Sequence, residues 1–203
     1  MYPKILFFVL GLFFPLWASA QELYRSLNIQ AGVNLSKIRY YDRLTSSDFV
    51  VRPSLELTAE FPFCSMMSVS GGIGFTQKGY YEANSFQRED GEEVDLRVIS
   101  SYFTVPMQLH LYPLRQNNFE VQVGLLHSFL LKRRFDFIPE MDAPCGKARV
   151  YDLAISAGLA YHFRYLSVGI DYQYGLLPTY KGSGFNDRTW HFSLGYKIPL
   201  RKR

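Results

Sequence analysis

Residues 151–176 alternate between apolar side chains and small or polar ones. Every second position is apolar from Tyr151 to Phe163, and the alternation resumes from Leu166 to Leu176 after a two-residue break. A period of two is typical of β-strands, because successive side chains point to opposite faces. Each run exceeds the roughly 5–6 residues of a soluble strand and is close to the roughly 9–11 residues with which a tilted strand crosses a bilayer.

The two faces of this predicted hairpin differ in a way that favours a membrane. One face is continuously apolar, and the other carries Gly, Ser, Ala and a few charges. A soluble sandwich would bury the apolar face and expose larger polar side chains, whereas a membrane barrel turns the apolar face to lipid. We therefore expect Leu153, Ile155, Val168 and Ile170 to face acyl chains.

The same alternation predicts six further strands along the chain. They cover Leu27–Leu35, Val51–Phe61, Met67–Phe75, Tyr102–Leu111, Phe119–Leu125 and Trp190–Ile198. Loops are predicted at 84–97, 132–149 and 178–188, and the connections alternate between long and short. This asymmetry is typical of outer-membrane barrels, with short periplasmic turns and long external loops. We predict an all-β, eight-stranded antiparallel up-and-down transmembrane β-barrel with both termini periplasmic. Eight strands leave a lumen that side chains fill.

The first twenty residues read as a cleavable signal peptide. Lys4 supplies the positive start, Ile5 to Trp17 is apolar, and the A-x-A site at Ala20 leaves Gln21 as the mature N-terminus. An uncleaved anchor helix is the alternative. The predicted domains are a signal peptide at 1–20 and a barrel domain at 21–203.

Composition agrees with a barrel. The 203 residues are 48% hydrophobic and 17% aromatic, yet the mean hydropathy is −0.07, as alternating strands require. The net charge is +4, but basic residues are scattered apart from 132–134 and 201–203, and no nucleic-acid motif accompanies them. Cys64 and Cys145 are predicted at opposite ends of the barrel, which argues against a disulfide.

The polar positions inside the predicted barrel give the candidate site. Its members share an inward strand phase: Glu56, Glu60, His110, Asp152, His162, Asp171 and Lys197. We expect an ion-pair network, with Arg52 and Glu120 contributing, because charges in a narrow lumen must be paired. A metal or acid–base cluster around His110 and His162 is the alternative. No HExxH, CxxC or GxSxG motif is present, and no Ser–His–acid set is apparent on adjacent strands. We therefore predict no catalytic, metal or cofactor site.

Three short motifs carry a family resemblance. Gly74–Gly79 resembles the Gly-x-x-x-Lys-Gly end of the third strand in PorT-like outer-membrane β-barrel domains of the Bacteroidota. Tyr102–Pro106 is similar to that family's Tyr-Leu-Glu-Ile-Pro, with Thr104 in place of Glu, and Leu194–Ile198 resembles its closing strand, although Ile198 replaces a common final Phe. The resemblance implies an outer-membrane protein, and some relatives are linked to protein secretion.

The sequence thus predicts a structural or interaction role rather than an enzyme. The expected partners are outer-membrane lipid, the barrel-assembly machinery and a protein at the external loops. A small ligand- or ion-passing barrel is one alternative, and a soluble lipocalin-like periplasmic binding barrel is another.

Overall fold

The computed structural model describes residues 25–40, 47–64, 66–87, 91, 93–113, 118–138, 149–179 and 185–200. The predicted signal peptide, its cleavage point at Ala20 and Gln21, and Cys145 lie outside the described residues. The strands are β1 (Arg25–Tyr40), β2 (Asp48–Cys64), β3 (Met67–Gln87), β4 (Glu93–Leu111), β5 (Phe119–Ile138), β6 (Tyr151–Phe163), β7 (Leu166–Gly175) and β8 (Phe185–Leu200). Within the described ranges, no helix is long and apolar enough to cross a membrane.

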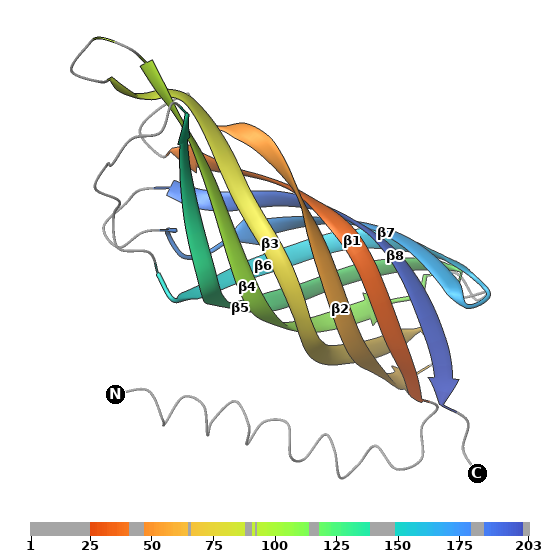
Figure 1. Ribbon diagram of the computed structural model, residues 1–203. Coiled ribbons are helices and arrows are strands. Elements are labelled where there is room, and N and C mark those ends of the chain that lie inside the picture. Colours follow the sequence, from red (N-terminus) through yellow and green to blue (C-terminus); the bar gives the residue numbers. More distant parts are fainter. Residues whose placement is uncertain are drawn as a thin grey trace, which may run out of the picture.

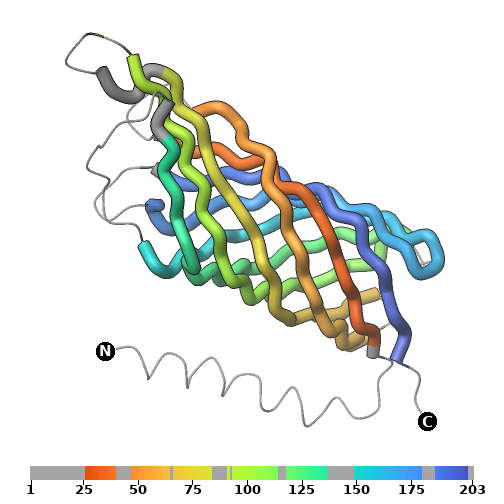
Figure 2. The backbone as a smooth tube through the Cα atoms, viewed as in Figure 1, coloured from red at the N-terminus to blue at the C-terminus, as the bar shows by residue number. Residues whose placement is uncertain are grey.

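The strands form one closed antiparallel ring in sequence order, and β8 pairs with β1 (Figure 1, Figure 2). This confirms the predicted eight-stranded up-and-down barrel. The closing pair stays in register along the whole of β1, from Arg25 opposite Leu200 to Tyr40 opposite Phe185. Ring closure leaves no open sheet edge within the spanning part, and this satisfies the backbone hydrogen bonds that lipid cannot.

The two ends of the barrel are joined differently. We call "turn end" the end where β1 begins, β8 finishes, and β2–β3, β4–β5 and β6–β7 connect (Figure 1). The opposite end is the "loop end". β6 and β7 are joined by a two-residue turn between Phe163 and Leu166, in which Arg164 has a φ of 60°. Left-handed φ values are a property of the two-residue turns that suit β-hairpins.

The apolar face of the strands points outward. Ile155, Val168 and Ile170 are 43%, 51% and 36% exposed, and the intervening positions are buried polar or small residues. The predicted orientation of the alternation is therefore confirmed at these three positions. A lipocalin-like barrel would place its apolar side chains inside, so the outer face favours lipid as the surrounding solvent.

Aromatic side chains border this apolar face toward the loop end. Phe75, Phe103 and Phe129 occupy paired outward positions on β3, β4 and β5, and Tyr151 continues the row on β6. On the other side of the barrel Tyr172 packs on Trp190, with 4.8 Å between ring centroids. At the turn end the ring pairs are Tyr161–Phe163, at 4.6 Å, and Tyr165–Tyr196, at 6.2 Å. Two aromatic bands of this kind are typical of the lipid interfaces of outer-membrane barrels.

Beyond the loop-end aromatic row, the strands continue with the opposite pattern. On β4, Val94, Leu96 and Val98 are buried, while Glu93 and Arg97 are exposed. A small apolar core forms there from Ile38, Tyr80, Leu96 and Val98, with Phe135 packed against it. We call this part the loop-end extension. It is built as in a soluble protein, because its outer face is polar and its core is apolar.

This extension corrects two predicted loops. Residues 93–97 belong to β4, and β3 reaches Gln87, so the predicted loop at 84–97 is mostly a hairpin. Residues 132–138 belong to β5, and a register irregularity between Ser101 and Tyr102 precedes them. The loop predictions were wrong because they assumed one lipid-facing pattern along each strand. The lengths of the connections between strands therefore alternate less regularly than the sequence predicted.

Side chains of β1 reach β3 across the inner side of β2. Asn34 donates to the Thr76 hydroxyl at 2.6 Å and to the Gln77 carbonyl at 2.9 Å. Ser36 accepts from the Gly79 N–H at 2.7 Å and donates to the Gly79 carbonyl at 2.8 Å. The β2–β3 register shifts at this level. These bonds connect β1 directly to β3 just below the apolar core.

Candidate functional site

The first layer of lumen side chains, at the turn end, centres on the Glu60 carboxylate. Lys197 lies 2.6 Å from its Oε2 atom, and Oε1 accepts hydrogen bonds from Tyr112 and Ser68, both at 2.6 Å. Ser26 donates to Oε2 at 3.3 Å. Four donors from β1, β3, the end of β4 and β8 thus converge on one buried carboxylate of β2. Such convergence offsets the cost of placing a charge in a narrow lumen.

A second cluster lies beside it and joins two histidines through one carboxylate. Glu120 contacts His110 Nδ1 at 2.6 Å and His162 Nε2 at 2.7 Å. The other nitrogen of His110, Nε2, lies 2.7 Å from the Ser70 hydroxyl. The chain Ser70–His110–Glu120–His162 therefore runs across β3, β4, β5 and β6. With the Glu60 cluster it occupies the cross-section near the turn end.

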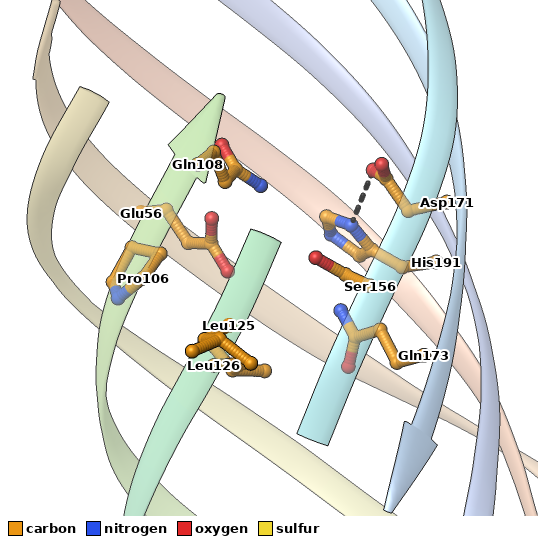
Figure 3. A pocket seen from close by; sticks show the side chains of 9 residues that line it. All are labelled: Glu56, Pro106, Gln108, Leu125, Leu126, Ser156, Asp171, Gln173 and His191. Atoms are coloured by element: carbon orange, nitrogen blue, oxygen red, sulfur yellow. Dashed lines mark hydrogen bonds and ion pairs between the residues drawn. The ribbon is translucent and has the colours of Figure 1, made fainter. Parts of the chain in front are cut away.

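The middle of the lumen holds a third cluster (Figure 3). His191 Nε2 lies 2.9 Å from the Ser54 hydroxyl, and His191 Nδ1 lies 3.4 Å from Asp171 Oδ2. Gln122 donates to the other oxygen of Asp171. Glu56 faces the same space and is 6% exposed. The space between them is a cavity of about 10 Å³, which is room for about one water molecule.

Charged side chains form a fourth cluster toward the loop end. Lys78 lies 3.9 Å from Asp152, and Asp187 accepts a hydrogen bond from Thr179 at 3.2 Å. Arg133 donates to Ser100 at 2.7 Å and to Tyr102 at 3.1 Å. Lys78 comes from the Gly-x-x-x-Lys-Gly motif, so one physical role of that motif is to place an ammonium group inside the barrel.

Outside the membrane span, a neighbouring carboxylate shifts the pKa of one tyrosine hydroxyl. On the loop-end extension Tyr81 donates a hydrogen bond to Asp95. This bond to a carboxylate raises the pKa of the Tyr81 hydroxyl above its ordinary value.

Inward glycines make room for these polar clusters. A Cβ atom on Gly158 would overlap Asp171, and one on Gly74 would lie 2.7 Å from the Thr104 hydroxyl and 2.9 Å from Glu56. Gly32 lies beneath the Ser54–His191 hydrogen bond, which spans from β2 to β8 over β1. The small inward residues and the long polar ones are therefore parts of one packing arrangement.

Every residue of the predicted interior cluster faces the lumen, but these residues lie at three different levels along the barrel axis. Glu60, Lys197, His110 and His162 lie near the turn end. Glu56 and Asp171 lie in the middle, and Asp152 lies toward the loop end. The predicted ion-pair role of Arg52 was wrong for the described residues, because it forms no ion pair there and its Nε lacks a partner.

The expectation that no Ser–His–acid set lies on adjacent strands was wrong for Ser70, His110 and Glu120, which come from β3, β4 and β5. Ser54–His191–Asp171 and Ser70–His110–Glu120 both have the connectivity of a catalytic triad. The Ser54–His191–Asp171 set could not be found by comparing neighbouring strands, because Ser54 and His191 lie on β2 and β8, on either side of β1. The second depends on strand register, which the sequence pattern does not supply. Lys78, Tyr112 and Asp187 were missed as lumen residues because strand ends were misplaced.

The surroundings of these two sets differ from those of an esterase. Ser54 and Ser70 are 6% and 7% exposed, and the cavity beside His191 and Asp171 of the first set has room for about one water. The surrounding strand N–H groups are committed to the sheet, so they cannot serve as an oxyanion hole. Within the described residues, no three His, Cys, Asp or Glu side chains are arranged to hold a metal ion.

Comparisons with known proteins agree with this architecture. A family model described as "Outer membrane protein beta-barrel domain" matches residues 18–181. The structure of Ail from Yersinia pestis in complex with a heparin analogue is 16% identical, with a TM-score of 0.50, and the match covers 87% of this chain and all of Ail. OprG from Pseudomonas aeruginosa is 11% identical, with a TM-score of 0.42 and coverages of 87% and 96%.

At these sequence identities the solved structures support the fold alone. A comparison with curated proteins found no match. The family model, in contrast, extends over most of the chain, including seven of the eight strands, β1 to β7. This chain belongs to the outer membrane protein β-barrel domain family.

Proposed function

We propose that this chain is a non-conducting outer-membrane barrel with a structural or interaction role. The observation that supports this is the filled lumen. Hydrogen-bonded polar clusters succeed one another from the Glu60–Lys197 pair at the turn end to the Lys78–Asp152 pair toward the loop end. In the middle cluster of the described residues, the cavity beside Glu56 and His191 has room for about one water, and a hydrated ion or a solute needs a wider continuous path.

The loop-end extension is the part that such a barrel would present to a partner. Its apolar core keeps β3, β4 and β5 folded beyond the aromatic row. Its outer face carries exposed charges, among them Glu93 and Arg97 on β4 and Arg134 on β5. A rigid, charged surface on a membrane anchor suits recognition of another protein. The proposal includes no catalytic activity and no cofactor.

Conductance in planar bilayers tests the closed lumen. The refolded chain is expected to give no steady single-channel steps. A variant with Tyr112, His110 and His162 replaced by serine opens the turn-end layer alone and should also give no steps, because the middle cluster and the Lys78–Asp152 pair still fill the lumen. Folding of both is checked by heat-modifiable gel mobility. Steady steps from the unaltered barrel would contradict the proposal and favour the alternative, a small ligand- or ion-passing barrel.

The finer assignment is to the PorT-like barrels of the Bacteroidota, with a link to protein secretion. It is supported by the motifs at 74–79 and 102–106. Lys78 of the first motif is buried in the lumen, as is Thr104, which departs from the family's Glu in the second. We propose removal of residues 1–20 between Ala20 and Gln21, insertion by the barrel-assembly machinery, and periplasmic termini. An epitope inserted at Gly91 should be stained on intact cells, whereas one after Arg203 should require permeabilised cells. The reverse pattern would refute this orientation.

A further inference from the structure

Two basic side chains lie directly opposite each other on the outer face of the barrel. Lys37 of β1 pairs in register with Arg188 of β8. Both follow the outward phase, because the neighbouring positions Ser36 and Thr189 are buried in the lumen. Like charges in directly opposed positions of an antiparallel pair are destabilising. This arrangement therefore calls for a compensating anion.

The described residues supply no such anion. Neither cation forms a salt bridge in the described part of the chain, and the Arg188 Nε is buried without a hydrogen-bond partner. Asp48 lies next in sequence to Phe49, but it pairs with Tyr81 on the far side of β2. The two cations instead lie against aromatic rings. Lys37 lies 4.5 Å from the centre of the Phe49 ring, and Arg188 lies 5.5 Å from that of Tyr174.

The position of the Lys37–Arg188 pair along the barrel axis indicates which anion it can bind. The row of outward positions nearer the turn end consists of Tyr172, Trp190, Leu35 and Val51. Trp190 is 42% exposed and Val51 58% exposed, so this row lies on the lipid-facing surface, in its aromatic border. The Lys37–Arg188 pair is the next outward-facing pair beyond that row, two residues further along β1. Lipid phosphates occupy this depth, just outside the acyl chains and level with interfacial aromatics.

We infer that Lys37 and Arg188 form a binding site for the anionic phosphate of a membrane lipid in the leaflet at the loop end. Arg188 supplies a guanidinium that forms no salt bridge among the described residues, and Lys37 supplies a second positive charge on the neighbouring strand. Phe49 and Tyr174 flank the two cations and hold them at the interface. In the orientation proposed above, this leaflet is the outer one.

The test uses Trp190 as a reporter beside the site. In the full chain carrying Trp17→Phe, Trp190 is the sole tryptophan. The barrel is placed in phosphatidylcholine bilayers containing brominated phosphatidylglycerol or, separately, brominated phosphatidylcholine at equal fraction. Bromine on the acyl chains quenches Trp190 in proportion to local occupancy. We expect the anionic lipid to be enriched about fivefold for each base, since a base near the surface contributes about 1 kcal/mol.

The variant Lys37→Gln/Arg188→Gln should lose this preference, and Arg97→Gln should keep it. Arg97 is an exposed base on the same extension, but it lies opposite Asp136. Equal quenching by the two lipids, or a preference that survives in the double variant, would overturn the inference. Loss of the preference on adding millimolar inorganic phosphate would assign the site to free phosphate and overturn the lipid assignment. Absence of quenching by either lipid would instead contradict the membrane location itself.

Discussion

The Asp171 carboxylate lies over Gly158, its directly opposite partner on β6. A side chain at position 158 would occupy the space of one carboxylate oxygen and of the Ile170 carbonyl. This oxygen accepts the hydrogen bond of Gln122, and the second carboxylate oxygen contacts His191. The absence of a side chain on one strand thus allows a polar cluster to form across four others.

The variant Gly158→Ala is therefore expected to destabilise the barrel by about 1–3 kcal/mol, as overpacking does in well-packed interiors. Gly169→Ala is the matched control on β7. Its new Cβ would meet only the Ser193 hydroxyl, at 2.8 Å, which can rotate away. Urea unfolding in micelles, followed by gel mobility, compares the two. Equal stabilities for both variants would refute this account of the inward glycines.

The Glu60–Lys197 pair connects β2 and β8 and should stabilise the closed ring. Replacing Glu60 by Ala leaves the ammonium without its partner and removes the acceptor of Tyr112 and Ser68. We expect a loss of about 2 kcal/mol, less than for a fully buried pair because Lys197 remains 26% exposed. A double-mutant cycle with Lys197→Met measures the coupling. Additive effects of the two substitutions would show that the ion pair contributes no stability.

The two Ser–His–acid sets should behave as structural hydrogen bonds. Ser54→Ala and Ser70→Ala are each expected to cost about 1 kcal/mol of stability. Neither serine of the unaltered protein should react with a fluorophosphonate probe in its folded state. Labelling that disappears in one of the two alanine variants would identify a reactive serine and reverse the non-enzymatic interpretation.

The loop-end extension should open separately from the membrane span. Leu96→Ala removes part of its apolar core and should cost about 2 kcal/mol there. Hydrogen exchange is expected to accelerate at residues 78–82 and 94–98 and to stay unchanged at residues 153–161. Ile99→Ala, on the outward face of the same strand, is the control and should change neither region. Faster exchange throughout the barrel in Leu96→Ala would argue against an independent extension.

The sequence was informative where one pattern held along a whole strand. The β6–β7 hairpin was predicted to within one residue, since β7 ends at Gly175 and the prediction ended at Leu176; its apolar positions meet lipid and its polar positions meet the lumen throughout. The sequence pattern was misleading on β4, where Phe103 and Val98 are both apolar but Phe103 points outward and Val98 points inward. The solvent outside the barrel changes from lipid to water between them, and a fixed period cannot indicate that change.

The lumen was predictable as a set of residues but not as contacts. The strand phase turned Glu60, His110 and Lys197 inward, since phase depends only on the alternation. Which of them meet depends on strand stagger and on glycines of neighbouring strands. The Ser54–His191 bond over Gly32 is one such contact, and no spacing in the sequence points to it.

Lipid surrounds the barrel, and side chains rather than water fill its lumen. The most direct measurement is a nitroxide scan of β8 from residue 190 to 196 in lipid vesicles, with Cys64 and Cys145 replaced by serine. The account predicts high oxygen accessibility at Phe192 and Leu194, and low accessibility at Ser193 and Gly195 to both oxygen and a water-soluble nickel reagent. Strong nickel accessibility at Ser193 and Gly195 would reveal a water-filled lumen and contradict the claim, as would the absence of alternation.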